Sequence, residues 1–301
     1  MTLALAPAAT ATRRGIMLML LAILLFTAMD AVAKGLVARY PTPQIVWARF
    51  AGQALIVIVI LNRAIGPALR TRWPFLHLLR SVFQFGATMF FFYGLNHIGL
   101  AEATALTDIN PVLITLGAAL FLGERLGPHR IAGVIVAMIG AMIVIRPGMS
   151  VFTPAAILPL CAALCYSGNA LLTRWIGPQE PPWTAMLYTA LFGTLASGLL
   201  LPAVWVPVPM GDWATFALMG MLGAGAQLCI IRSFSLAEAS VVAPFGYVGI
   251  LFATLWGIVL FGEYPDAFTI VGALVIVGAG LYVWHRETRA ARRRPDGAKA
   301  A

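Results

Sequence analysis

The residues of this chain best able to do chemistry are a few charged side chains that interrupt long apolar stretches. A charge in such a stretch is costly to bury, so its presence marks a candidate site. Asp30, Arg49 and Asp108 fall at similar depths, about 9–12 Å from the same end of their stretches if these are helical. Arg49 can hold a carboxylate and either aspartate an ammonium. Lys34 follows Asp30 by four residues and can join them on one helix face.

These four charges predict either a gate or a docking site for a zwitterion, and a structural ion-pair cluster joining three helices is the alternative. Neutral polar and aromatic groups near the middle of the stretches extend the candidate site: Thr27, Gln84, Thr88, Asn110, Tyr166, Asn169, Gln227, Tyr247 and Trp256. They could orient a substrate, or they could bond helix to helix, as is common in bundles. Pro111 and Pro244 lack a backbone N–H and can kink their helices, which frees carbonyls for the site.

The sequence offers little for catalysis, metal binding or ATP use. Cys161, Cys165 and Cys229 lie in apolar stretches without a neighbouring histidine, so we interpret them as core packing. The four histidines are scattered near the ends of the stretches, away from any nucleophile–base pair. A phosphate-cradling Gly-x-x-x-x-Gly-Lys loop is missing, so ATP does not drive the protein directly. We predict no metal, no cofactor and no enzyme; an integral membrane enzyme is the alternative from a different class.

The elements that position these residues are transmembrane helices. The chain is 61% hydrophobic and only 10% charged, with a mean hydropathy of +0.91, whereas soluble domains carry about 25% charged residues. Ten apolar runs are long enough to cross a bilayer: 15–37, 43–62, 74–97, 100–122, 129–146, 153–175, 183–202, 212–235, 239–261 and 266–285. The sequence therefore predicts an all-α polytopic membrane protein with ten transmembrane helices.

The basic residues predict the orientation of this protein in the membrane. The net charge of +9 could indicate nucleic acid, but the lysines and arginines sit in gaps between runs and in the tail, without interleaved aromatics. Ten crossings put both termini on one side, which receives fifteen of these residues against three on the other. Because Lys and Arg concentrate on the cytoplasmic side, we predict a bacterial inner-membrane protein with both termini cytoplasmic. The first run is too long for a cleaved signal peptide, and the tail from Arg286 to Lys299 favours anionic lipid head groups.

An internal repeat relates the two halves of the chain. Residues 100–124 read LAEATALTDINPVLITLGAALFLGE, and residues 236–263 read LAEASVVAPFGYVGILFATLWGIVLFGE. Each is followed by a helix with spaced glycines, so the repeat unit is five helices, and an odd number inverts the second copy. We predict an N-terminus (1–14), two inverted repeats around a central cavity (15–146 and 147–285), and a basic tail (286–301). Inverted repeats with a midplane site are typical of transporters.

These features resemble the drug/metabolite transporter superfamily, EamA-type branch. The resemblance rests on the two A-E-A…G-E helices, on Lys34…Pro43…Arg49-Phe50, and on the run from Pro111-Val112 through Gly123-Glu124-Arg125. It implies a ten-helix basket, a central cavity and alternating access without ATP. Within the superfamily, the chain is similar to bacterial exporters of amino acids, including aromatic ones. The resemblance thus implies a small-molecule substrate, neutral or aromatic amino acids first, with a lipophilic drug or S-adenosylmethionine as alternatives. Membrane lipids are the other expected partner, and we expect a monomer.

Overall fold

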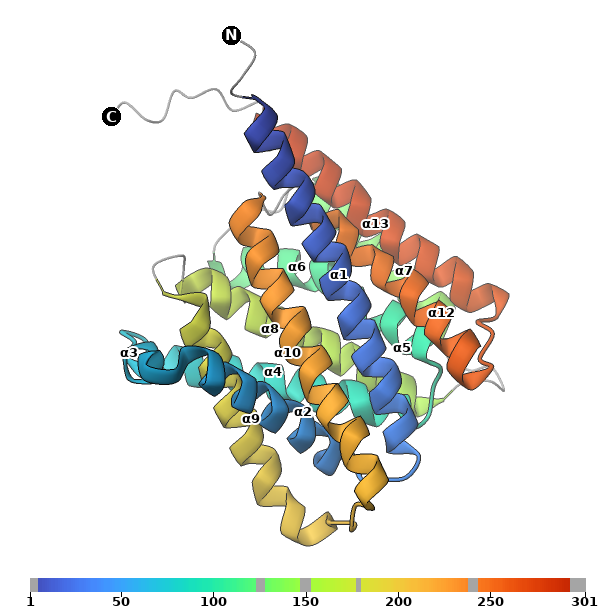
Figure 1. Ribbon diagram of the computed structural model, residues 1–301. Helices are drawn as coiled ribbons and strands as arrows, with labels where there is room; N and C mark the ends of the chain where they lie inside the picture. The colour runs from blue at the N-terminus through green and yellow to red at the C-terminus, as the bar shows by residue number, and fades with distance from the viewer. Residues whose placement is uncertain (1–4, 123–127, 147–152, 177–179, 238–242, 293–301) are drawn as a thin grey trace.

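The computed structural model describes residues 5–122, 128–146, 153–176, 180–237 and 243–292, and these ranges form helices and short connections (Figure 1). Within these ranges, seven helical segments are long and apolar enough to cross a membrane. They belong to α1 (Leu5–Val37), α2 (Thr42–Leu61), α4 (Pro74–Leu95), α8 (Ile157–Ile176), α9 (Pro182–Val204), α10 (Trp213–Leu236) and α13 (Ala267–Arg292).

Three further crossings are shorter or interrupted. They are α7 (Pro128–Ile145), the pair α5 (Leu100–Thr107) and α6 (Asn110–Leu122), and the pair η4 (Ala243–Val248) and α12 (Gly249–Phe261). The connections contain η1 (Asn62–Ala64), α3 (Ile65–Leu69), η2 (Pro154–Ala156) and η3 (Met210–Asp212). The predicted all-α architecture of ten crossings is confirmed. Gly123, Glu124 and Arg125 of the repeat pattern, and Glu238, lie outside the described residues.

The helices pack as two related halves, α1–α7 and α8–α13. If the first five crossings correspond in order to the last five, then α1 corresponds to α8 and α4 to α10. In agreement, α1 packs against α10 as α8 packs against α4, while α2 packs on α9 and α7 on α13. The start of α1 and the end of α13 lie at the same end of the bundle, as an even number of crossings requires (Figure 1).

Glycines allow the helices to come close at equivalent positions in the two halves. A Cβ atom on Gly133 of α7 would overlap with Val283 of α13, and a Cβ atom on Gly272 of α13 would overlap with Val144 of α7. Small residues permit close backbone approach, which replaces the hydrophobic driving force that is missing between helices in lipid. The α7–α13 contact is therefore close to symmetric.

The fourth crossing is broken, and the described part of the ninth begins as a 3-10 helix. In the first half, α5 ends at Thr107 and α6 begins at Asn110, directly before Pro111. In the second half, Pro244 lies in the 3-10 turn η4 that precedes α12. Because proline cannot donate a backbone hydrogen bond, an α-helix is readily interrupted at such positions. Both crossings thus depart from a continuous α-helix next to a proline, and such departures in transporters can serve a site.

Candidate functional site

A charge pair joins α1, α2 and α4 in the interior. Arg49 of α2 donates from Nη1 to Thr88 Oγ1 of α4 over 2.5 Å, and its guanidinium lies 5.3 Å from the ring of Phe50 and 5.7 Å from that of Phe92. Asp30 of α1 interacts electrostatically with Arg49. Within the described residues, Arg49 Nε is buried and has no hydrogen-bond partner. The guanidinium is thus held in place but keeps a free donor.

Asp108 occupies the break between α5 and α6. It interacts electrostatically with Tyr166 of α8 and Tyr247 of η4, and its buried Oδ2 has no hydrogen-bond partner in the described part of the chain. The Tyr247 hydroxyl lies against Gly280 of α13, where a Cβ atom would overlap with it. Tyr166 is 40% exposed, and Asp108 is also partly accessible.

Amide and hydroxyl groups line the contact between α4 and α8. Asn169 Nδ2 donates to Gln84 Oε1 over 2.8 Å, and Arg80 Nε donates to Thr173 Oγ1 over 2.6 Å. Sequence reasoning did not include Arg80 among the candidates, although it precedes Gln84 by four residues and so shares its helix face. That spacing is the signal that could have found it.

The other candidates are spread over several contacts. Trp256 of α12 donates from Nε1 to Thr27 Oγ1 of α1 over 3.3 Å. The backbone carbonyl of Asn110 accepts from Ser167 Oγ of α8 over 3.2 Å. Gln227 lies partly buried on α10. The structure therefore brings together Asp30, Arg49 and Thr88 in one group and Asp108, Tyr166 and Tyr247 in another.

Lys34 lies apart from the Asp30–Arg49 pair. Its ammonium is 2.8 Å from Glu263 Oε1 and donates to the Ile98 carbonyl over 2.7 Å. Glu263 also accepts from the backbone N–H of Leu100 over 3.1 Å, at the start of α5. Gly262 positions this carboxylate, because it ends α12 with φ +64°, a conformation that glycine adopts at little cost. We call this the Glu263 end of the bundle.

Two more ion pairs link the halves. Each uses an arginine in the connection that follows α1 or α7. Arg146, after α7, lies 2.5 Å from Asp266 before α13. Arg39, after α1, lies 2.9 Å from Asp212 of η3. Each pair joins one residue of the first half to one of the second, as the Lys34–Glu263 pair does. The halves are thus tied by charge at the ends of α1 and α7.

The halves are also linked at the opposite end, which we call the Glu180 end. Glu180, before α9, accepts from the Thr71 hydroxyl over 2.9 Å and from the Arg72 backbone N–H over 3.2 Å. Ser233 of α10 donates to the Gly15 carbonyl of α1 over 2.7 Å. Polar contacts therefore join the halves at both ends.

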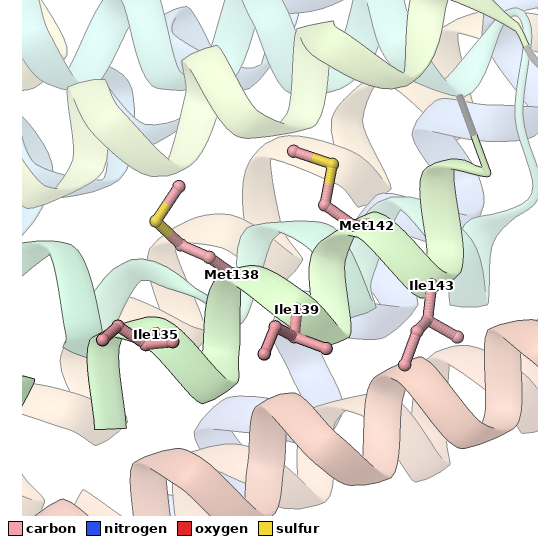
Figure 2. Close-up of a pocket in the computed structure, with 5 residues that line it drawn as sticks. All are labelled: Ile135, Met138, Ile139, Met142 and Ile143. Atoms are coloured by element: carbon pink, nitrogen blue, oxygen red, sulfur yellow. The ribbon is translucent and has the colours of Figure 1, made fainter. Parts of the chain in front are cut away.

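A groove of about 440 Å³ lies along α7 and is lined by Ile135, Met138, Ile139, Met142 and Ile143. Figure 2 shows Met138 and Met142 on one side of α7 and Ile143 on the other. The lining holds only apolar side chains, which suit lipid tails and offer nothing to orient a polar metabolite. Within the described ranges, no three His, Cys, Asp or Glu side chains come together to hold a metal ion.

Comparisons with known proteins extend over nearly the whole chain. The EamA-like transporter family matches residues 13–146 and again residues 153–284. The chain is 30% identical to the pseudopaline exporter of Pseudomonas aeruginosa, covering 89% of this chain and 94% of the relative. It is 31% identical to a riboflavin transporter of Rhizobium johnstonii, covering 93% of each.

More distant similarities also extend over nearly the whole chain. An S-adenosylmethionine uptake transporter of Rickettsia bellii is 23% identical over 93% of this chain and 96% of its own. A solved crystal structure shares the fold with a TM-score of 0.61 and 22% identity, covering 92% of this chain and 98% of that one. The twofold family match agrees with the repeat, and relatives of this kind are transporters and not enzymes. The chain belongs to the EamA-like transporter family.

Proposed function

We propose that this transporter exports small metabolites that carry an α-amino-acid head group, with neutral and aromatic amino acids as the first candidates. The observation that carries the proposal is that hydrogen-bond donors of cationic side chains and an acceptor of an anionic side chain are buried without partners. Arg49 Nε, Arg80 Nη1 and Asp108 Oδ2 are buried and have no hydrogen-bond partner within the described residues. Leaving such a group unpaired costs about 1–3 kcal/mol, so the site favours a ligand with an anionic and a cationic end.

Aromatic side chains near these charges support a substrate that carries a ring. Tyr166, which is 40% exposed, interacts with Asp108, and the Trp256 indole is oriented by its hydrogen bond to Thr27. Rings stack favourably on such side chains. S-adenosylmethionine combines a fused heteroaromatic ring with an α-amino-acid head group, so it is the alternative substrate, in keeping with one of the relatives. Riboflavin supplies a ring without that head group.

Alternating access is the mechanism that the two halves support. Ion pairs join the halves at the Glu263 end, and Glu180 and Ser233 join them at the other. If each set of contacts opens in turn, the interior charges face one side of the membrane and then the other. From the distribution of Lys and Arg, the Glu180 end is cytoplasmic and the Glu263 end periplasmic.

Counterflow tests the substrate. The purified protein is reconstituted in liposomes loaded with phenylalanine, threonine, S-adenosylmethionine, riboflavin or tetraphenylphosphonium, and uptake of the labelled compound is followed. Saturable counterflow of compounds with an α-amino-acid head group is expected. Flux of riboflavin alone, or of the lipophilic cation alone, would contradict the proposal.

Two variants test whether the charge of Asp108 binds the substrate. Asp108→Asn removes the charge expected to hold the ammonium and should reduce counterflow about tenfold or more, because a charge-assisted hydrogen bond contributes about 1.5–3 kcal/mol. Asp296→Asn makes the same carboxylate-to-amide change in the C-terminal tail, outside the ten predicted crossings, and is the matched control that should leave counterflow close to that of the unmodified protein. Equal effects of the two changes would count against Asp108 as a binding residue.

A further inference from the structure

Arg80 is a second guanidinium within a crossing, and a hydrogen bond to the neighbouring helix orients it. It lies on α4, six residues after the helix begins at Pro74, and is partly buried. Its Nε donates to Thr173 Oγ1 of α8 over 2.6 Å. The Thr173 hydroxyl in turn donates to the Asn169 carbonyl over 2.7 Å. The guanidinium is therefore positioned before any ligand arrives.

Within the described residues, Arg80 has no carboxylate partner. The ion pairs found there use Lys34, Arg39, Arg146 and His77, and Arg49 interacts with Asp30. Arg80 Nη1 is buried and lacks a hydrogen-bond partner in the same residues. A guanidinium that lies within a transmembrane helix without a counter-ion is costly, and an anionic group from a ligand would offset that cost.

The neighbours of Arg80 connect it with the other residues of the candidate site. Arg80, Gln84 and Thr88 follow one another at intervals of four residues and share a face of α4. Thr88 accepts from Arg49, so this row joins two guanidiniums about 12 Å apart along the helix axis, at 1.5 Å per residue. Tyr166 interacts electrostatically with both Arg80 and Asp108. The unpaired cation and the unpaired carboxylate thus have a common neighbour.

We infer that Arg80 is a carboxylate-binding residue of the transport path, on the Glu180 side of Asp108. A guanidinium presents two parallel N–H groups that match a carboxylate, and Nη1 is the donor left free here. The substrate carboxylate binds at Arg80 while its ammonium binds at Asp108, and Thr173 acts as a positioning residue. This inference rests on the proposed function, because it names the group that receives the carboxylate of the same substrate.

Binding of three matched ligands to the purified full-length protein tests the inference. Phenylalanine carries both charges, phenethylamine lacks the carboxylate, and 3-phenylpropionate lacks the ammonium. Dissociation constants are measured by isothermal titration calorimetry for the unmodified protein, Arg80→Gln, Arg80→Lys and Arg63→Gln. Arg63 is an exposed arginine in the connection after α2 and serves as the matched control.

We expect Arg80→Gln to weaken phenylalanine and 3-phenylpropionate about tenfold or more, as loss of a charge-assisted bond implies, with phenethylamine unchanged. Arg80→Lys should keep part of the preference for the two carboxylates, and Arg63→Gln should change none of the constants. Equal weakening of all three ligands by Arg80→Gln, or none, would overturn the role of Arg80. Binding of 3-phenylpropionate that depends on Arg80, without binding of phenylalanine, would keep that role and overturn the amino-acid proposal. Failure of the unmodified protein to bind either carboxylate would overturn both.

Discussion

Glu263 shows how much a single side chain can matter at the end of a helix. It pairs with Lys34, whose side chain is only 9% exposed, and it accepts from the first N–H of α5. Glu263→Gln leaves the buried ammonium without its counter-ion, so we expect the free energy of unfolding to fall by about 1–3 kcal/mol. Thermal unfolding of the detergent-purified protein measures the change.

Arg39→Gln provides the comparison for this prediction. Arg39 is 54% exposed in its pair with Asp212, and exposed ion pairs contribute about 0–1 kcal/mol because water and salt screen them. The loss should therefore be clearly smaller than for Glu263→Gln. A loss as large as that of Glu263→Gln would show that burial of Lys34 does not set the cost.

Asp266 supports a prediction about pH. It lies before the first residue of α13, and burial alone would raise the pKa of its carboxyl. The hydrogen bonds from Thr269 and the Arg146 guanidinium outweigh burial and hold this pKa below its ordinary value. A lowered carboxyl pKa contributes stability above its unfolded value of about 3.9, and this contribution is lost as the pH falls through the folded value.

The unmodified protein should therefore unfold at a higher temperature than Asp266→Asn near pH 7, and the difference should begin to narrow as the pH falls below about 4. Thermal scans of both proteins from pH 3.5 to 7 measure it. A difference that stays constant over this range would mean that the carboxyl charge is not what stabilises the start of α13.

At the scale of elements, the α7–α13 contact tests the symmetry of the two halves. Gly133→Ala and Gly272→Ala each place a methyl group against a valine of the opposite helix, Val283 or Val144. Overpacking of this kind costs about 1–3 kcal/mol, and we expect similar losses for the two variants. Gly278→Ala is the control on the same helix, since a Cβ atom there meets nothing within 4 Å.

Unfolding temperatures of the three variants in detergent provide the measurement. Losses for Gly133→Ala and Gly272→Ala that exceed the effect of Gly278→Ala would agree with a close and nearly symmetric contact. If one of the first two variants were neutral, the two sides of the contact would not be equivalent.

For the whole molecule, alternating access predicts that the Glu263 end must open during transport. Lys34→Cys and Glu263→Cys are introduced together in a protein from which Cys161, Cys165 and Cys229 have been removed. A short, reducible cross-linker between them should stop counterflow, and reduction should restore it. Each single-cysteine variant treated in the same way is the control. Full transport by the cross-linked protein would rule out opening at this position.

The direction of the chain in the membrane is a second property of the whole molecule. Arg63 and Gly211 are both exposed, in connections at opposite ends of the bundle. If both termini are cytoplasmic, a membrane-impermeant maleimide applied to intact bacterial cells should label Gly211→Cys and not Arg63→Cys. The reverse pattern would invert the topology that the positive charges predict.

Much of the architecture could be predicted from the sequence because lipid imposes local rules. Each crossing must be apolar, long enough to span the bilayer, and able to pair its own backbone N–H and C=O groups. Apolar runs alone therefore predict ten helices. The repeat followed from two similar stretches, and the interior charges stood out because each interrupts an apolar run. Pro111 lies directly after the break between α5 and α6, where a local rule about proline applies.

Partners in the interior were decided by the tertiary structure. Lys34 could reach Asp30 on the same helix, but the close approach of α1, α5 and α12 offers it Glu263 and the Ile98 carbonyl. The neighbours of Arg80 depend on packing between helices, because Thr173 and Tyr166 come from α8. The sequence by itself therefore determined the number of crossings, their duplication and the set of interior charges, whereas pairing among those charges depends on packing between helices distant in the chain.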